Sequence, residues 1–127
     1  MSSMQRVRAE TYQGKRIMVV DGTDATAEGY AEILREGAAA VTAEPAGTVL
    51  LATVVKGARY GAGAAERLKA YSRAIRPHVR ASAVVGLSPM QRVIFNAIRP
   101  FLHASVRDFA TLAEAREWLV RLDDAPR

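Results

Sequence analysis

Hydrophobic and polar positions alternate along the first part of the chain as they do in β-strands. Residues 5–12 alternate small or apolar side chains with charged ones and lead into a turn at residues 13–15, which predicts an edge strand entering a hairpin. Residues 16–21, RIMVVD, form a continuous apolar run that is bounded by Gly22. A run of this kind predicts a strand that is covered on both faces.

The rest of the chain alternates between segments of helical period and short apolar runs. Strands are predicted at residues 48–55, 79–85 and 106–109, and apolar residues recur every three or four positions in the segments that precede and follow these runs. Two of the helical segments open with a capping box, at residues 88–91 and 111–114, where a serine or threonine precedes a glutamine or glutamate by three positions. Four helices are therefore expected.

The predicted order is strand, strand, helix, strand, helix, strand, helix, strand, helix. Strands that are joined through helices run parallel, with right-handed crossovers, so the carboxyl ends of these strands meet at one rim of the sheet. We therefore predict an α/β fold with a single domain over residues 5–122 and a mixed, mostly parallel sheet of about five strands. Residues 1–4 and 123–127 are expected to be flexible tails.

Four short segments carry a resemblance to a known family. They are YQGK at residues 12–15 with Asp21 closing the next strand, RPHVR at residues 76–80, AVVGLS at residues 83–88, and the stretch from DFAT at residues 108–111 to Trp118 and Leu119. Over about residues 10–120 the chain resembles the STAS-like (SpoIIAA-like) domains, also described as STAS/SEC14 domains, and within them an uncharacterised bacterial branch. The resemblance implies a regulatory or binding module more often than an enzyme.

The sequence departs from the anti-sigma factor antagonists of this family at one functional position. In those proteins a serine at the start of the helix after the central strand is phosphorylated and switches partner binding. Here that junction, residues 56–63, has the sequence KGARYGAG, in which Tyr60 carries the one hydroxyl group. We therefore interpret the chain as a non-enzymatic STAS-like regulatory or protein-interaction module without the phosphorylatable serine.

Length and composition narrow the class of protein further. The chain has 127 residues, which is the length of one domain, and it has no cysteine, so disulfides and thiolate chemistry are excluded. None of its apolar runs approaches the ~20 residues of a membrane span, and the first residues have no apolar core of the kind that a signal peptide needs. A cytoplasmic location, no transmembrane segment and no cofactor are therefore expected.

The net charge of +5 arises in the second half of the chain. Between residues 67 and 107 there are eight basic residues and no acidic ones, which predicts attraction to an anionic partner. Helical spacing arranges five of these into a predicted basic patch: Lys69, Arg73, Arg76, Arg92 and Arg99. An acidic protein or an anionic lipid surface is favoured over nucleic acid, because stacking aromatics are not interleaved with the basic residues. The alternative is a patch that serves only solubility.

Glycines and basic residues follow the strand at residues 48–55, where backbone amides of a loop can surround a phosphate. A ligand or anion site is hypothesised at this loop and at the end of the preceding strand, from Asp21, Lys56, Arg59, Tyr60, Gly61 and Gly63. It would make the protein a binder of a lipid-like or phosphate-bearing small molecule. The alternative is a loop that needs glycine only for its backbone dihedral angles.

The segment VVDGTDAT at residues 19–26 partly resembles the nucleophile motif of haloacid-dehalogenase-like phosphatases. The position of the attacking carboxylate is Val19, and Asp21 with Asp24 alone would hold magnesium poorly. These residues are better explained as a turn and a helix cap. No catalytic residue and no metal site is therefore predicted.

The helix that opens at Ser88 is more apolar than a one-sided helix requires. Met90, Val93 and Ile98 are expected on its core side. With 100° of rotation per residue, its apolar residues cover about 200° around the helix axis, whereas a core-facing stripe needs about 100°. Phe95 and Leu102 lie on the flank of this arc. They predict an apolar interface, most simply that of a homodimer, with an apolar ligand pocket or deep burial as the alternatives.

Overall fold

The computed structural model describes residues 5–102 and 105–124 and confirms the predicted α/β fold class and element order. In chain order the main elements are β1 (Val7–Tyr12), β2 (Lys15–Asp21), α1 (Ala27–Thr42), β3 (Val49–Val54), α2 (Ala64–Ile75), β4 (Val79–Val85), α3 (Pro89–Ile98), β5 (Val106–Phe109) and α4 (Leu112–Asp124). Two 3-10 turns, η1 (Arg76–His78) and η2 (Arg99–Phe101), continue α2 and α3.

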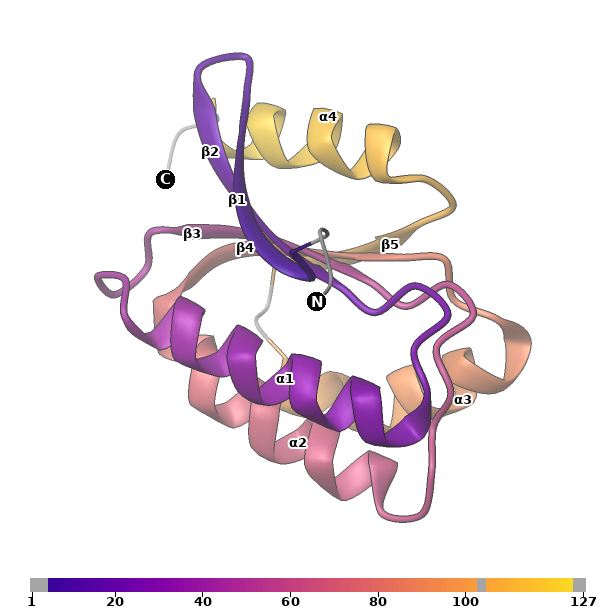
Figure 1. Ribbon diagram of the computed structural model, residues 1–127. Helices are drawn as coiled ribbons and strands as arrows, with labels where there is room; N and C mark the ends of the chain where they lie inside the picture. Colours follow the sequence, from indigo (N-terminus) through magenta and orange to yellow (C-terminus); the bar gives the residue numbers. More distant parts are fainter. Residues whose placement is uncertain (1–4, 103–104, 125–127) are drawn as a thin grey trace.

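The five strands form one sheet in the sequential order β1-β2-β3-β4-β5. β1 pairs with β2 in an antiparallel arrangement, and the other three neighbouring pairs are parallel. Since every right-handed crossover advances in the same direction across the sheet, the crossover helices α1, α2 and α3 all lie on one face. Of the helices in the described part of the chain, α4 is the one that covers the opposite face (Figure 1).

The alternation of side chains along the strands divides the core into two clusters, one on each face of the sheet. In β2, Met18 and Val20 pack toward α1–α3, whereas Ile17 and Val19 pack toward α4. The cluster under α4 is closed by Leu119, which is fully buried. All six residues of β3 are buried, as expected for a central strand covered on both sides.

Both predicted capping boxes are formed. The Ser88 hydroxyl accepts from the Gln91 amide at 3.1 Å, and the Gln91 side-chain oxygen accepts from the Ser88 amide at 2.9 Å. Thr111 and Glu114 exchange the same pair of bonds, each at 3.2 Å, at the start of α4. These caps satisfy amides that have no partner inside the helix and so define where α3 and α4 begin.

The carboxyl end of α4 corrects one predicted boundary. The helix continues through Asp124 instead of ending at residue 122, because Asp123 and Asp124 each lie 2.9 Å from the ammonium group of Lys15 on the β1–β2 hairpin. The hairpin rises beside α4, and Tyr12 also donates to Glu117 of that helix (Figure 1). The other predicted tail residues, 1–4 and 125–127, lie outside the described residues.

Candidate functional site

A cleft of about 410 Å³ opens at the rim where the parallel strands end. Residues 57–61, which follow β3, form one wall, and Ser88, Met90, Gln91 and Ile94, which follow β4, form the other. β3 and β4 are parallel neighbours, so the segments that leave their carboxyl ends meet at this rim. The topology therefore places the cleft where ligand sites of α/β domains are commonly found.

Gln91 connects the two walls of the cleft. Its side-chain nitrogen donates to the backbone oxygens of Val55 at 2.8 Å and Ala58 at 3.0 Å, while its side-chain oxygen serves the capping box. The residue is only 6% exposed. All the polar groups of the Gln91 side chain are thus engaged, and the amide fixes the loop after β3 against α3. The sequence pattern identified Gln91 only as a cap.

Three of the predicted ligand-site residues, Arg59, Tyr60 and Gly61, line this cleft. Lys56 and Gly63 belong to the same loop, but neither lines the cleft, and Gly63 serves as the N-cap of α2 with a φ of 77°. The predicted need for glycine is therefore conformational at Gly63. The glycine-rich loop contributes a wall and one cation to the cleft.

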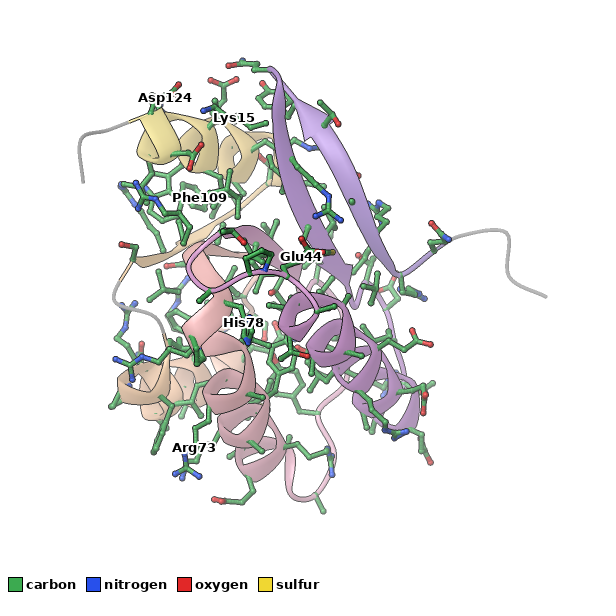
Figure 2. All side chains as sticks on the ribbon, turned by 90° about the vertical axis from the view of Figure 1, so that its left-hand side faces the viewer. Lys15, Glu44, Arg73, His78, Phe109 and Asp124 are labelled. Carbon is green, nitrogen blue, oxygen red and sulfur yellow. The ribbon has the colours of Figure 1, made fainter. Side chains whose placement is uncertain are left out.

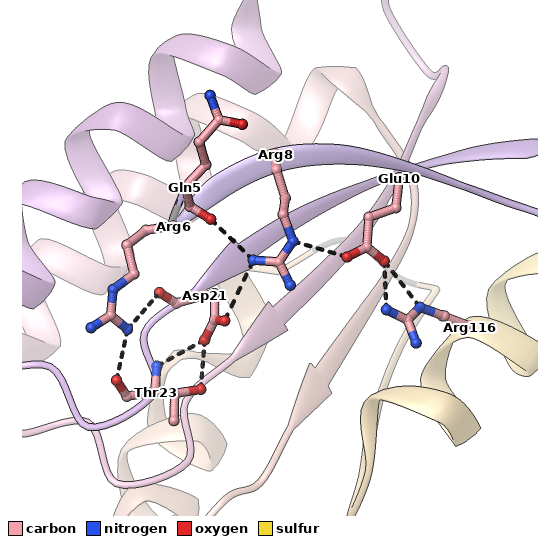
Figure 3. Close-up of polar contacts among 7 residues, drawn as sticks. All are labelled: Gln5, Arg6, Arg8, Glu10, Asp21, Thr23 and Arg116. Atoms are coloured by element: carbon pink, nitrogen blue, oxygen red, sulfur yellow. Dashed lines mark hydrogen bonds and ion pairs between the residues drawn. The ribbon is translucent and has the colours of Figure 1, made fainter. Parts of the chain in front are cut away.

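Asp21 lies away from the cleft, which corrects its predicted place in the ligand site. It is in register with Ile17 and Val19, so its side chain points to the α4 face of the sheet. One carboxylate oxygen accepts from the amide and hydroxyl of Thr23 at 3.0 and 2.5 Å, and the other lies 3.5 Å from Arg8 (Figure 3). The carboxylate therefore closes the turn after β2.

A network of arginines and carboxylates extends from Asp21 along β1 (Figure 3). Arg8 lies 2.9 Å from Glu10, and Arg116 of α4 donates twice to the same carboxylate, at 3.1 and 2.6 Å. Burial alone would raise the pKa of Glu10, but the bonds from Arg8 and Arg116 outweigh it and lower the pKa. For Asp21, burial is likewise outweighed by the bonds from Thr23 and Arg8, so its pKa is also lowered. These contacts hold the hairpin against α4.

Replacing Asp21 with asparagine is expected to flatten the loss of stability in acid. Since the folded-state pKa lies below the unfolded value of about 3.9, the carboxylate stabilises the fold above that value, and this contribution is lost as the pH falls through the folded pKa. The variant should be less stable at pH 7 by at most about 1 kcal/mol, and should lose less stability between about pH 5 and pH 2. Urea denaturation followed by circular dichroism across this pH range measures both effects.

The matched control is Asp24→Asn, which changes an exposed carboxylate three residues away in the same turn. Its pH dependence of unfolding free energy is the reference against which the effect of Asp21→Asn is compared. If the unfolding free energy of the two variants changes with pH in the same way, the contacts of Asp21 do not contribute to the loss of stability in acid, and their interpretation is wrong.

The predicted basic patch is only partly assembled in space. Lys69 and Arg73 of α2 both lie over the ring of Phe101, at 5.5 and 4.7 Å from its centre, and Arg99 lies 4.8 Å from the ring centre of Phe95. Figure 2 shows Arg73 pointing away from the sheet. The ring of Phe101 in η2 therefore contacts both cations of α2. Arg99 is the first residue of the same 3-10 turn.

Arg92 separates from this group, which corrects its predicted place in the patch. Its guanidinium lies 2.9 Å from the carboxylate of Asp108 on β5. The bond to Asp108 raises the pKa of Arg92. The positive charge of Arg92 is balanced by the neighbouring carboxylate, so the pair adds little net charge to this surface. The spacing of arginines on one helix could not identify an acidic partner on a different strand.

The exposed apolar residues of α3 also differ from the expectation. Phe95 is 4% exposed and belongs to the core, and Leu102 is partly buried against the same core, whereas Met90 and Val93 are 78% and 70% exposed. The exposed apolar residues of α3 are therefore Met90 and Val93, and Phe95 is buried. The buried side of α3 consists of Gln91, Phe95 and Ile98, and Gln91 is held there by its bonds to the loop after β3.

Among residues 5–102 and 105–124, no group of three or more histidine, aspartate or glutamate side chains is arranged to hold a metal ion. Within the same described residues, none of the helices combines the length and apolar content that a membrane crossing needs.

The fold is that of a small α/β domain with a cleft at the carboxyl ends of its parallel strands. The SpoIIAA-like family model matches residues 17–120, so the chain belongs to the SpoIIAA-like family, and the resemblance to STAS-like domains is confirmed. A crystal structure of an uncharacterized protein of the DUF3478 family with a SpoIIAA-like fold, from Shewanella loihica PV-4, superimposes with a TM-score of 0.66. The two share 16% sequence identity over 94% of this chain and 98% of that one, which shows a common fold. No curated protein matches the chain.

Proposed function

We propose that this protein is a non-enzymatic regulatory or protein-interaction module that associates through the outer face of α3. The observation that carries the proposal is the exposure of Met90 and Val93 beside the cleft, at 78% and 70%. They are the large hydrophobic residues that the described part of the chain leaves exposed, and their spacing of three places them on one side of the helix. Exposed apolar side chains at neighbouring positions favour burial against a partner.

A second copy of the chain is the partner that this face fits best. With a net charge of +5, two copies repel over much of their surface. The exposed face of α3 is an exception, because Asn96 and Ala97 are uncharged and Arg92 is paired with Asp108. Two such faces can meet around a twofold axis with little electrostatic cost.

The groups that line the cleft support binding rather than catalysis. Ser88 and Gln91 are committed to the capping box, and Gln91 also holds the loop after β3. Arg59 is the charged side chain among the described lining residues, and neither a carboxylate nor a histidine accompanies it. General acid–base catalysis needs a group that exchanges protons near neutral pH, which an arginine does not supply.

Replacing Val93 with glutamate is expected to weaken the dimer at least tenfold. Each interface would then bury two carboxylates that face one another across the symmetry axis without a counter-charge. Native mass spectrometry and light scattering over a range of protein concentrations measure the dissociation constant. The matched control is Ala113→Glu, at an exposed position of α4 on the other face of the sheet, and it should leave the constant unchanged.

The same experiment tests the alternative, a small-ligand binder. The cleft falls within the range of about 300–1,000 Å³ typical of small-molecule sites, and Arg59 could pair with a phosphate-bearing or lipid-like molecule. A wild-type protein that stays monomeric at all concentrations and retains a copurifying small molecule would overturn the dimer and favour the ligand. The basic residues around Phe101 lie outside the proposed interface, and an acidic protein or anionic lipid surface remains the prediction for them.

A further inference from the structure

Basic side chains gather at the rim of the sheet opposite the cleft. Arg73 lies in the last turn of α2, Arg76 begins η1, and Arg99 begins η2. β4 follows η1 and β5 follows η2, and these two strands are parallel neighbours, so both 3-10 turns lie at the amino ends of the strands. The cleft lies at the carboxyl ends. Together with Lys69, these three arginines are called the basic surface below.

Two half-buried side chains hold the basic surface together. Lys69 and Arg73 of α2 both lie over the ring of Phe101, at 5.5 and 4.7 Å from its centre. Arg76 and Leu102 line the same small hollow at the end of α2. Phe101 and Leu102 come directly after Arg99 and Pro100 in the chain, so cations of two separate helical segments share one surface.

The positive charge of this surface is largely uncompensated. Among the described residues, Arg73, Arg76 and Arg99 have no carboxylate within ion-pair distance, and Lys69 is paired with the exposed Glu66 at 3.3 Å. The sequence has no acidic residue between positions 67 and 107. Cations at the end of a helix offset its dipole, but each terminus carries only about half a negative charge. Four cations at two termini therefore leave a clear excess of positive charge.

Two of these arginines are held in position for oxyanions. The guanidinium of Arg73 lies over Phe101, and that of Arg99 lies 4.8 Å from the ring centre of Phe95. An arginine that packs its flat face on a ring keeps the N–H groups at its edge free to donate, and less of its freedom is lost on binding. Figure 2 shows Arg73 pointing away from the sheet. Phosphate and carboxylate oxygens are the acceptors that fit such an edge.

The shape of the basic surface favours a broad partner over a peptide that inserts its side chains. The hollow beside Arg76 has about 10 Å³, which is no more than the roughly 10–15 Å³ that one water molecule needs. Peptides are usually recognised by pockets that take individual side chains or by a groove that takes a helix. A lipid bilayer needs neither, because its headgroups form a continuous anionic layer.

We propose that the basic surface binds the phosphate and carboxylate groups of an anionic lipid bilayer, which would lie across the ends of α2 and α3. The attraction is electrostatic, and the two ring-supported arginines donate to headgroup oxygens. The basic surface includes neither Met90 nor Val93, so the proposal does not depend on association through α3.

Vesicle partitioning of the full chain tests the proposal. The wild-type protein should cosediment with vesicles of equimolar phosphatidylcholine and phosphatidylserine at about 0.1 M salt, and it should stay in solution with phosphatidylcholine alone. The double variant Arg73→Gln with Arg99→Gln should lower the partition coefficient about 20-fold, because each basic residue near an anionic bilayer strengthens binding about fivefold.

The matched control is the double variant Arg35→Gln with Arg121→Gln, which lowers the net charge by the same amount. Arg35 belongs to α1 and Arg121 to α4, on opposite faces of the sheet, so one bilayer cannot contact both. This variant should lower the partition coefficient less than about threefold. Circular dichroism checks that both double variants are folded.

Three results would overturn the proposal. The first is a wild-type protein that shows no preference for phosphatidylserine. The second is an equal loss of binding in the two double variants, which would mean that net charge and not the basic surface determines binding. The third is a wild-type protein that binds polyglutamate but not the vesicles, which would assign the surface to an acidic protein instead.

Discussion

Replacing Gln91 with glutamate is expected to lower the free energy of unfolding by about 3–5 kcal/mol at pH 7, because it buries a charge without a partner. The amide nitrogen that donates to the carbonyls of Val55 and Ala58 becomes an oxygen that faces them. Burial and the two carbonyl oxygens should raise the pKa of the new carboxyl group. The loss should therefore be full at neutral pH and shrink as acid protonates the side chain, which restores a donor. Urea denaturation at several pH values measures this.

Two further variants separate charge from the lost hydrogen bonds. Gln91→Met removes the donor without adding a charge and should cost about 1–3 kcal/mol at every pH. Asn96→Asp makes the same amide-to-carboxylate change at an exposed position of α3 and should stay within about 0.5 kcal/mol of the wild type. If Gln91→Glu behaves like Asn96→Asp, the glutamine does not hold the two walls of the cleft together.

Replacing Leu119 with alanine is expected to cost about 2–5 kcal/mol of unfolding free energy, the range for a buried leucine. Leu119 is fully buried and packs into the cluster that contains Ile17, Val19 and Leu50. Within residues 5–102 and 105–124, α4 is the one helix on that face, so none of the other described helices is placed to fill the space that the alanine leaves. Urea denaturation followed by circular dichroism measures the change.

The control for this prediction is Leu112→Ala in the same helix. Leu112 is only partly buried, so removing its side chain should cost less than about 1.5 kcal/mol. Equal costs for the two variants would mean that burial under α4 does not determine the stability of this face of the sheet.

Local patterns in the sequence were sufficient for the order of the elements and for the starts of α3 and α4. The pairing of Ser88 with Gln91, and of Thr111 with Glu114, spans three positions, so the interacting groups can be identified without knowing the fold. The apolar run at residues 16–21 similarly predicted a strand covered on both faces. The later strands follow this one through connecting helices, and this predicted the parallel part of the sheet.

The candidate site was less predictable because its residues have partners far away in the chain. The carbonyls that hold Gln91 precede it by 36 and 33 positions, and the carboxylate that neutralises Arg92 follows it by 16. Nothing in a helical period distinguishes a glutamine that turns inward from one that stays in solvent. Because Gln91 shares the buried side of α3 with Phe95 and Ile98, Met90 and Val93 lie on the exposed side, where the apolar pattern had not placed them.

For this protein, the sequence by itself determined the order of elements, the family resemblance, the absence of thiol chemistry and the region where the strand-end loops meet. These depend on period, composition and contacts between near neighbours. Only the tertiary structure decided that Asp21 faces α4, that Arg92 is paired with Asp108, and that Phe95 is buried. Each of these depends on which side chain of another element lies opposite, and that is set when the helices and the sheet pack together.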